Sequence, residues 1–154
     1  MSTFTCLTYH FIFGTKYRQR AIVESVEQEF HAYIGGIIKG EKGRLIEIGG
    51  VEDHIHILAG FSPTISVSEM LKRIKGNSSK WINDTKKVER RFEWQVGYGA
   101  FSVSQSLVSR VRAYIRKQKE HHKKVTFEAE FLEYLHRHEI EYNPQYVFET
   151  EHVG

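Results

Sequence analysis

The sequence predicts an α+β domain with a largely antiparallel sheet, because strand-like and helix-like segments are intermixed along the chain. The 154 residues are enough for one domain with a real core and too few for two, so we expect a single domain over residues 1–154. Apolar residues make up 40% of the chain and aromatic residues 13%, which indicates a globular protein and excludes a disordered one.

The first half of the chain is predicted to contain three strands and two helices. Residues 4–13 alternate, with Tyr9 and Phe11 on one face and Thr8 and His10 on the other, which indicates a strand. The elements that follow are a helix over 25–39, a strand over 44–48, a strand over 53–59 and a helix over 67–81.

The second half is predicted to contain one short strand and two helices. Residues 92–96 indicate the strand, and we expect the exposed segment 94–104 to pack against a second copy of the chain. Apolar spacing predicts helices over 106–121 and 127–138. The tail, about residues 143–154, has no assignment.

Two histidines separated by one residue stand out in the strand predicted over 53–59. Side chains alternate along a strand, so His54 and His56 point to one face and Ile55 and Ile57 to the other. The two imidazoles would then lie roughly 6 to 7 Å apart, which suits two ligands of one divalent metal ion. The alternative is a half-exposed strand whose polar face carries histidine by chance.

The helix predicted over 106–121 carries a second group of polar residues. Tyr114 and Gln118 lie one turn apart within or beside its apolar stripe, and a buried glutamine needs hydrogen-bond partners. His121 and His122 continue the same side. One interpretation is that this face meets the metal face of the histidine strand; the other is that the helix end frays into solvent.

The charge distribution indicates a polyanionic partner, most simply nucleic acid. The net charge is only +3, but basic residues crowd the stretches 72–91 and 110–124. Solvated helix faces are the alternative. The residues expected to contact phosphates are Lys72, Arg73, Lys75, Lys80, Arg110 and Lys117.

The cellular compartment is predicted from sequence features that are absent. It has no apolar run long enough to span a membrane and no signal-peptide pattern. The single cysteine, Cys6, cannot form an internal disulfide, which fits a reducing cytoplasm. We therefore expect a cytoplasmic protein with no membrane partner.

These motifs together resemble a known family. His54-Ile55-His56 matches the HUH motif, and Tyr114 followed by Gln118 matches the Tyr-x-x-x-Gln helix of the single-tyrosine (Y1) transposases of short insertion sequences. The stretches 9–18 and 94–104 are also similar to that family. REP-associated tyrosine transposases are its relatives.

The resemblance implies a ferredoxin-like fold and a defined activity. Such enzymes cut and rejoin single-stranded DNA at hairpin-marked element ends, through a covalent 5′-phosphotyrosine. They act as homodimers in which the subunits can share active sites. The resemblance makes Tyr114 the nucleophile and His54, His56 and Gln118 the ligands of a divalent metal, Mg²⁺ or Mn²⁺.

Other functions fit the sequence less well. Histidine-triad hydrolases need a third histidine where this chain has Leu58, and no clear further ligand set supports a zinc hydrolase. A non-catalytic, RRM-like module that binds single-stranded nucleic acid stays open, as does a domesticated transposase. Retention of both histidines, the tyrosine and the glutamine favours an active enzyme.

Overall fold

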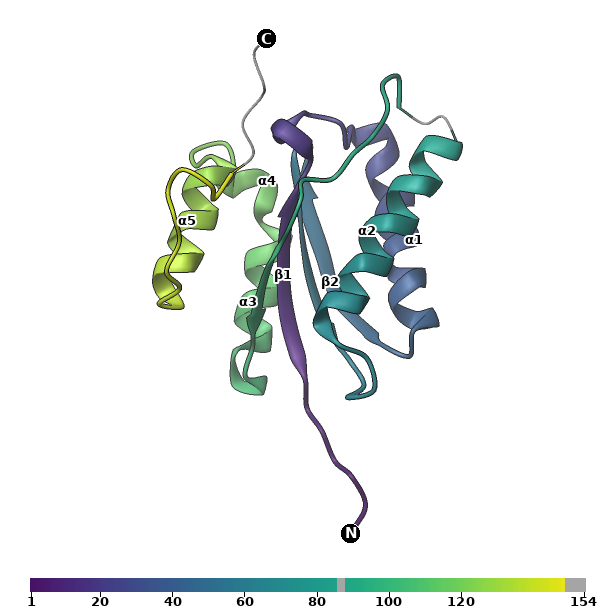
Figure 1. Cartoon of the computed structure of the whole chain (residues 1–154), viewed down its shortest axis with the longest axis vertical. Coiled ribbons are helices and arrows are strands. Elements are labelled where there is room, and N and C mark those ends of the chain that lie inside the picture. Colours follow the sequence, from purple (N-terminus) through teal and green to yellow (C-terminus); the bar gives the residue numbers. More distant parts are fainter. Residues whose placement is uncertain (86–87, 149–154) are drawn as a thin grey trace.

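The computed structural model describes residues 1–85 and 88–148, and its centre is a four-stranded antiparallel sheet (Figure 1). The strands are β1 (Thr8–Gly14), β2 (Arg44–Val51), β3 (His54–Gly60) and β4 (Gly99–Ser102). They lie in the order β2-β3-β1-β4, so β1 and β3 are central and paired on both sides. The predicted α+β class with an antiparallel sheet is confirmed.

Helices cover both faces of the sheet (Figure 1). One face carries α1 (Glu24–Gly40) and α2 (Val67–Asp84), and the other carries α3 (Val108–Arg116), α4 (Gln118–His121) and α5 (Phe127–Arg137). Short 3-10 turns, η1 (Lys16–Arg18) and η2 (Gln105–Leu107), precede α1 and α3. The succession β1-α1-β2-β3-α2-β4 is the ferredoxin-like one. Among the described residues, no helix combines the length and apolar character needed to cross a membrane.

The two central strands divide their side chains between the two helical layers. On β1, Phe11 and Phe13 enter the large apolar core under α1 and α2, whereas Ile12 packs against the aromatic residues of α5. On β3, Ile55 and Ile57 enter the large core. His54 and His56, which alternate with these isoleucines, therefore face α3–α5, as strand alternation predicts.

The edge strand lies later in the chain than the sequence predicts. Residues 92–96 contribute only an isolated bridge between Thr15 and Trp94, and the true edge strand β4 pairs with β1. The Trp94 side chain turns into the large core, where Nε1 donates to Ser78 Oγ at 3.0 Å. Trp94 and Phe101 are thus buried within their own chain, so the prediction of an exposed 94–104 segment is wrong for them.

The first strand is also shorter than predicted. Its pairing with β3 begins at Thr8, opposite Gly60, so the preceding residues lie outside the sheet register. Phe4 accordingly lies exposed, at 85% of its full accessible surface.

The helix predicted over 106–121 is divided at Lys117, whose φ of −98° and ψ of 16° are not helical. Before the break, α3 lies directly on β2. A Cβ at Gly49 would approach the Ile115 carbonyl oxygen to 2.7 Å, so only glycine permits this contact. After the break, the chain changes direction and Gln118 becomes buried between the sheet and α5.

Candidate active site and metal-binding cluster

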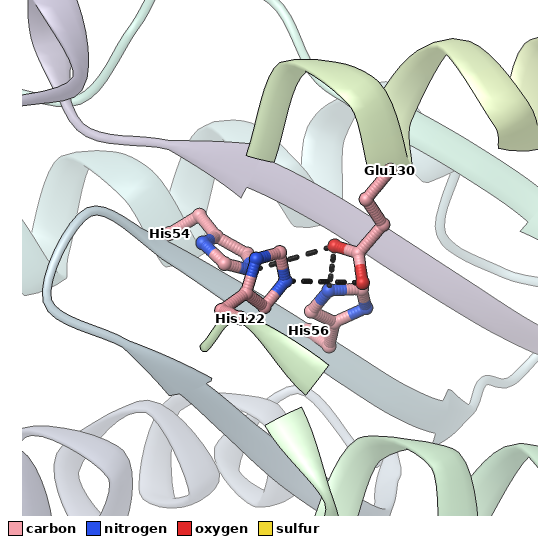
Figure 2. Close-up of side chains that lie close together, drawn as sticks. All are labelled: His54, His56, His122 and Glu130. Atoms are coloured by element: carbon pink, nitrogen blue, oxygen red, sulfur yellow. Dashed lines mark hydrogen bonds and ion pairs between the residues drawn. The ribbon is translucent and has the colours of Figure 1, made fainter. Parts of the chain in front are cut away.

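The two histidines of β3 meet a glutamate from α5 (Figure 2). His54 and His56 are fully buried, and their ring centroids lie 5.2 Å apart. His56 Nε2 lies 2.8 Å from Glu130 Oε1, and His54 Nε2 lies 3.4 Å from the same oxygen. Glu130 belongs to the first turn of α5, which Thr126 caps by accepting a hydrogen bond from the Ala129 N–H at 3.2 Å. This cap fixes the start of the helix that delivers the carboxylate.

A third histidine, which follows α4, reaches the same carboxylate. His122 Nε2 lies 3.1 Å from Glu130 Oε2, but not in hydrogen-bonding geometry. In the part of the chain that the structure describes, this buried nitrogen has no hydrogen-bond partner. Figure 2 shows these three imidazoles converging on Glu130. The imidazole of His121 also reaches this carboxylate, with Nε2 lying 3.3 Å from Glu130 Oε2.

Each of the three rings is held through its other nitrogen. The partners of the Nδ1 atoms are Asp53 Oδ1 at 2.7 Å for His54, His10 Nε2 at 2.8 Å for His56 and the Val125 carbonyl oxygen at 2.6 Å for His122. Outer partners of this kind fix the tautomer and orientation of metal-binding histidines. Every Nε2 is thereby directed to one point.

The predicted tyrosine and glutamine reach this point as well. The Tyr114 hydroxyl donates to Glu130 Oε2, and the Gln118 amide donates to the same oxygen at 3.1 Å. Gln118 Oε1 also lies 3.1 Å from His54 Nε2. The four residues singled out from the sequence therefore converge within one chain.

The cluster perturbs the protonation of both strand histidines. Burial lowers the pKa of His54, but its hydrogen bond to Asp53 and its contacts with Glu130 outweigh burial and raise the pKa to about 9. Burial dominates at His56 and lowers its pKa to about 4, although Glu130 acts in the opposite direction. One imidazole is thus cationic and the other neutral near pH 7.

Tyr114 and Glu130 shift in opposite directions. Burial and the hydrogen bond to Glu130 raise the pKa of the Tyr114 hydroxyl well above its ordinary range. Burial alone would raise the pKa of Glu130, but the imidazoles of His122, His54 and His56 hold it far below its usual range. The carboxylate is therefore ionised, and the phenol beside it keeps its proton.

The donor set fits a divalent metal ion. One ligand atom from each of His54, His56, His122 and Glu130 lies within 4.8 Å of the others, and three of these residues are buried. Imidazole and carboxylate donors are usual ligands of zinc and manganese. The buried Nε2 of His122, which lacks a hydrogen bond, is the kind of atom that a metal ion would satisfy.

The sequence reasoning missed Glu130 and assigned no role to His122. Glu130 looks like one of many surface acids, yet it follows Phe127 by three residues and so falls in the apolar stripe of α5. That spacing was the available signal, because an acid inside an apolar stripe must be buried with partners. The sequence places His122 only on the same side as Tyr114 and Gln118.

The residues predicted to bind DNA lie on both sides of the sheet. Lys72, Arg73, Lys75 and Lys80 belong to α2, on the face opposite the cluster, whereas Arg110 and Lys117 lie in and just after α3. Arg73 pairs with Glu41 and Glu69, and Lys80 pairs with Asp84 at 2.7 Å. Lys75 donates to the carbonyl oxygens of Gln95 and Gly97 at 2.7 and 2.6 Å. These three α2 cations already have partners in the fold.

Known structures share this fold. A crystal structure from Deinococcus radiodurans R1 described as a transposase aligns with a TM-score of 0.62 and 23% identity, over 77% of this chain and 95% of that one. A REP-associated tyrosine transposase bound to a REP hairpin aligns with a TM-score of 0.61 and 14% identity, over 81% of this chain and 76% of that one.

Sequence comparisons identify the family. The IS200 transposase of Salmonella typhimurium LT2 is 29% identical over 120 residues, 75% of this chain and 78% of the relative. The ISDra2 transposase TnpA of Deinococcus radiodurans is 24% identical over 117 residues, 73% of this chain and 84% of the relative. The family model described as "Transposase IS200 like" matches residues 3–118, a range that includes Tyr114 and Gln118 but ends before His122 and Glu130. The chain therefore belongs to the IS200-like, single-tyrosine transposase family.

Proposed function

We propose that this transposase cuts and rejoins single-stranded DNA at hairpin-marked ends of a mobile element, through a covalent 5′-phosphotyrosine on Tyr114. One observation supports it above the others: the Tyr114 hydroxyl and both β3 histidines contact the same carboxylate, Glu130. A nucleophile next to a metal-binding cluster is what phosphodiester transfer requires. The whole of residues 1–154 would act as one catalytic domain.

The chemistry assigns a role to each predicted residue. Attack by the Tyr114 oxygen forms a bond to phosphorus and breaks the bond to the 3′ oxygen, which takes up a proton and leaves as a hydroxyl. The tyrosine–phosphate bond conserves energy, so rejoining by the reverse attack needs no nucleotide cofactor. The proposed metal ligands are His54, His56 and Gln118. A divalent metal ion, when bound, withdraws charge from the phosphate, and imidazole ligands favour Mn²⁺ over Mg²⁺.

The Tyr114 proton is the obstacle that the site must overcome. Its pKa is raised by burial and by Glu130, so the hydroxyl is a poor nucleophile in the conformation described here. Binding of substrate and metal must therefore relieve the contact between Tyr114 and Glu130 before attack.

We propose single-stranded DNA with a hairpin as the partner. The structural neighbour bound to a REP hairpin supports this choice for a chain of the same fold. Arg110 and Lys117 lie on the cluster side of the sheet and would contact the strand to be cut. The α2 cations on the far face would contact the hairpin.

We also propose a homodimer, as the family resemblance implies. Tyr114 and the β3 histidines already meet within one chain, which favours complete sites in each subunit in this conformation. Exchange of the tyrosine helix between subunits would give the shared arrangement instead.

The decisive test is the covalent adduct. Tyr114→Phe removes only the hydroxyl, so DNA binding should survive while the adduct disappears from a denaturing gel of protein incubated with hairpin DNA and Mn²⁺. Tyr98→Phe, at a partly exposed tyrosine outside the cluster, is the control and should still form the adduct. An adduct with the Tyr114 variant would show that another residue is the nucleophile. Binding without any adduct by the wild type would favour a non-catalytic or domesticated protein.

A further inference from the structure

The segment after residue 118 supplies two of the four potential donors at the cluster. His122 follows α4 and Glu130 lies in α5, whereas His54 and His56 lie on β3 (Figure 2). Both additional residues lie beyond the range that matches the family model. They are thus features of this chain that the family match does not cover.

Tautomer geometry directs His122 toward the cluster. Its Nδ1 lies 2.6 Å from the Val125 carbonyl oxygen, which can only accept a hydrogen bond, so Nδ1 carries the proton. In the neutral ring, the lone pair is then on Nε2. That atom is buried, lies 3.1 Å from Glu130 Oε2 and has no hydrogen-bond partner among the described residues. The side chain is only 7% exposed, so water does not readily satisfy it.

Glu130 is buried even more completely, and its charge requires compensation. Its side chain is 1% exposed, and it is the carboxylate toward which the three Nε2 atoms point. A buried carboxylate among imidazoles either forms ion pairs with them or binds a metal ion together with them. A neutral His122 would place the lone pair of Nε2 against Glu130 Oε2 at 3.1 Å, and a metal ion bound by both atoms would remove this repulsion.

We infer that His122 and Glu130 are metal ligands together with His54 and His56, so that three imidazoles and one carboxylate join the Gln118 amide oxygen proposed above in holding the ion. The inference rests on the proposed metal-dependent function and extends its ligand set. Such a nitrogen-rich set selects Zn²⁺ and Mn²⁺ over Mg²⁺, which prefers oxygen ligands and retains its waters. Because the donors come from β3 and from the segment bearing α4 and α5, the bound ion also fastens α5 to the sheet.

Metal titration of the full chain tests the ligand set directly. The metal-free protein is titrated with ZnCl₂ and with MnCl₂ in a calorimeter, without DNA. Glu130→Gln and His122→Ala should each weaken binding by at least about tenfold, the lower end of the loss seen even for outer-shell partners. The matched controls on α5 are Glu133→Gln and His136→Ala, both at exposed positions, which should bind as the wild type does. Mg²⁺ should bind more weakly than either ion.

Two further measurements keep the outcome decisive. Hydrogen exchange of the wild-type protein needs no variant, and the amides of α5 should exchange more slowly when Zn²⁺ is added. Unchanged exchange, or wild-type affinity in folded Glu130→Gln and His122→Ala proteins, would overturn the inference. His56→Ala separates this failure from that of the proposed function. If only His56→Ala binds metal poorly, the ion is held without α4 and α5 and the proposed function stands; if it too binds normally, both are wrong.

Discussion

The two faces of the sheet are equally buried but chemically opposite. Toward α1 and α2, the central strands present Phe11, Phe13 and Ile57, all with no exposed surface. Toward α3–α5, the same strands present His54 and His56, also with no exposed surface. Burial alone therefore does not distinguish a packing face from a chemical one. The apolar atoms of one face are stabilised by the area that they bury, whereas the polar atoms of the other face need hydrogen-bond or metal partners.

The polar face depends on a network in which few groups can be removed alone. Glu130 accepts from Tyr114 and Gln118 and lies within ion-pair distance of the imidazoles of His54, His56, His121 and His122, so each polar group has several partners. Removing one member leaves buried polar atoms without partners, which costs about 1–3 kcal/mol for each unsatisfied group. The apolar face has no such interdependence, because its stability follows from buried area and close packing.

The largest effect is expected on the polar face. His56→Ala should reduce DNA cleavage by at least about 10³-fold, because a metal ion contributes several kcal/mol to phosphoryl transfer and this substitution removes a proposed ligand. Binding to hairpin DNA should persist, since it rests on cations and shape. Cleavage and band-shift assays on the same protein would separate the two effects. Full activity of the wild type in excess EDTA would contradict the metal requirement.

Substitution of Ile57, the residue after His56, should lower stability and leave metal binding unchanged. Ile57 lies next to His56 on β3 but faces the large core, where Ile57→Ala should lower the free energy of unfolding by about 2–5 kcal/mol. Metal affinity, measured under conditions where the variant is folded, should stay unchanged. Urea unfolding with and without Zn²⁺ reports both quantities. A weaker metal affinity in this variant would show that the two faces are coupled.

A smaller effect is expected in the pH dependence of stability without metal. The pKa of His54 is about 9 in the fold against 6.5 for the free side chain, so the folded state binds more protons between these values. The free energy of unfolding should therefore decrease as pH rises from 6.5 through about 9, by at most about 1.4 kcal/mol per pH unit. The shifts of His56 and Glu130 act below this window, and that of Tyr114 acts above it.

Asp53→Asn provides the matched control for this titration. It removes the charged partner of His54 Nδ1, so the decrease between pH 6.5 and 9 should flatten. Glu52→Gln, at the exposed position before it, should leave the decrease unchanged. Urea denaturation at several pH values measures each slope. A decrease that persists in the Asp53 variant would assign the proton to another group.

The faces differ as well in how far the sequence predicts them. Alternation along residues 8–14 and 54–60 predicts which side chains of β1 and β3 share a face, because a strand leaves only two directions. The meeting of the His-x-His strand with Tyr114 and Gln118 also follows from the sequence, since both motifs present polar groups that need buried partners. These patterns depend only on residues that are close to one another in the sequence.

The features that the sequence does not predict depend on contacts between residues far apart in the chain. Trp94 leaves the sheet edge because its indole fills the large core and finds Ser78, so β4 begins at Gly99. The close approach of Ile115 to Gly49, just before the break at Lys117, joins α3 to a strand far away in the sequence. Glu130 acquires its role only when α5 folds over β3. Each of these depends on residues distant in sequence, which a periodicity within one segment does not reveal.

The smallest effect concerns how each face contacts DNA phosphates. Arg110 and Lys117 are exposed and lie on the cluster side, whereas Arg73 and Lys80 on the far side already pair with acids. We expect the double variant Arg110→Gln/Lys117→Gln to reduce the slope of log affinity against log salt. The reduction should be about 0.7 for each phosphate of the single strand that the two cations neutralise in the wild type.

Arg73→Gln/Lys80→Gln should change this slope less, because those cations must first leave their acidic partners. Lys39→Gln, at an exposed position near the end of α1, is the single-charge control for a general decrease in positive charge. Filter binding to hairpin DNA at several salt concentrations measures the slopes. If the α2 pair carries the larger slope, the DNA is held chiefly on the face opposite the nucleophile, and its single-stranded end must then pass around the sheet edge to reach Tyr114.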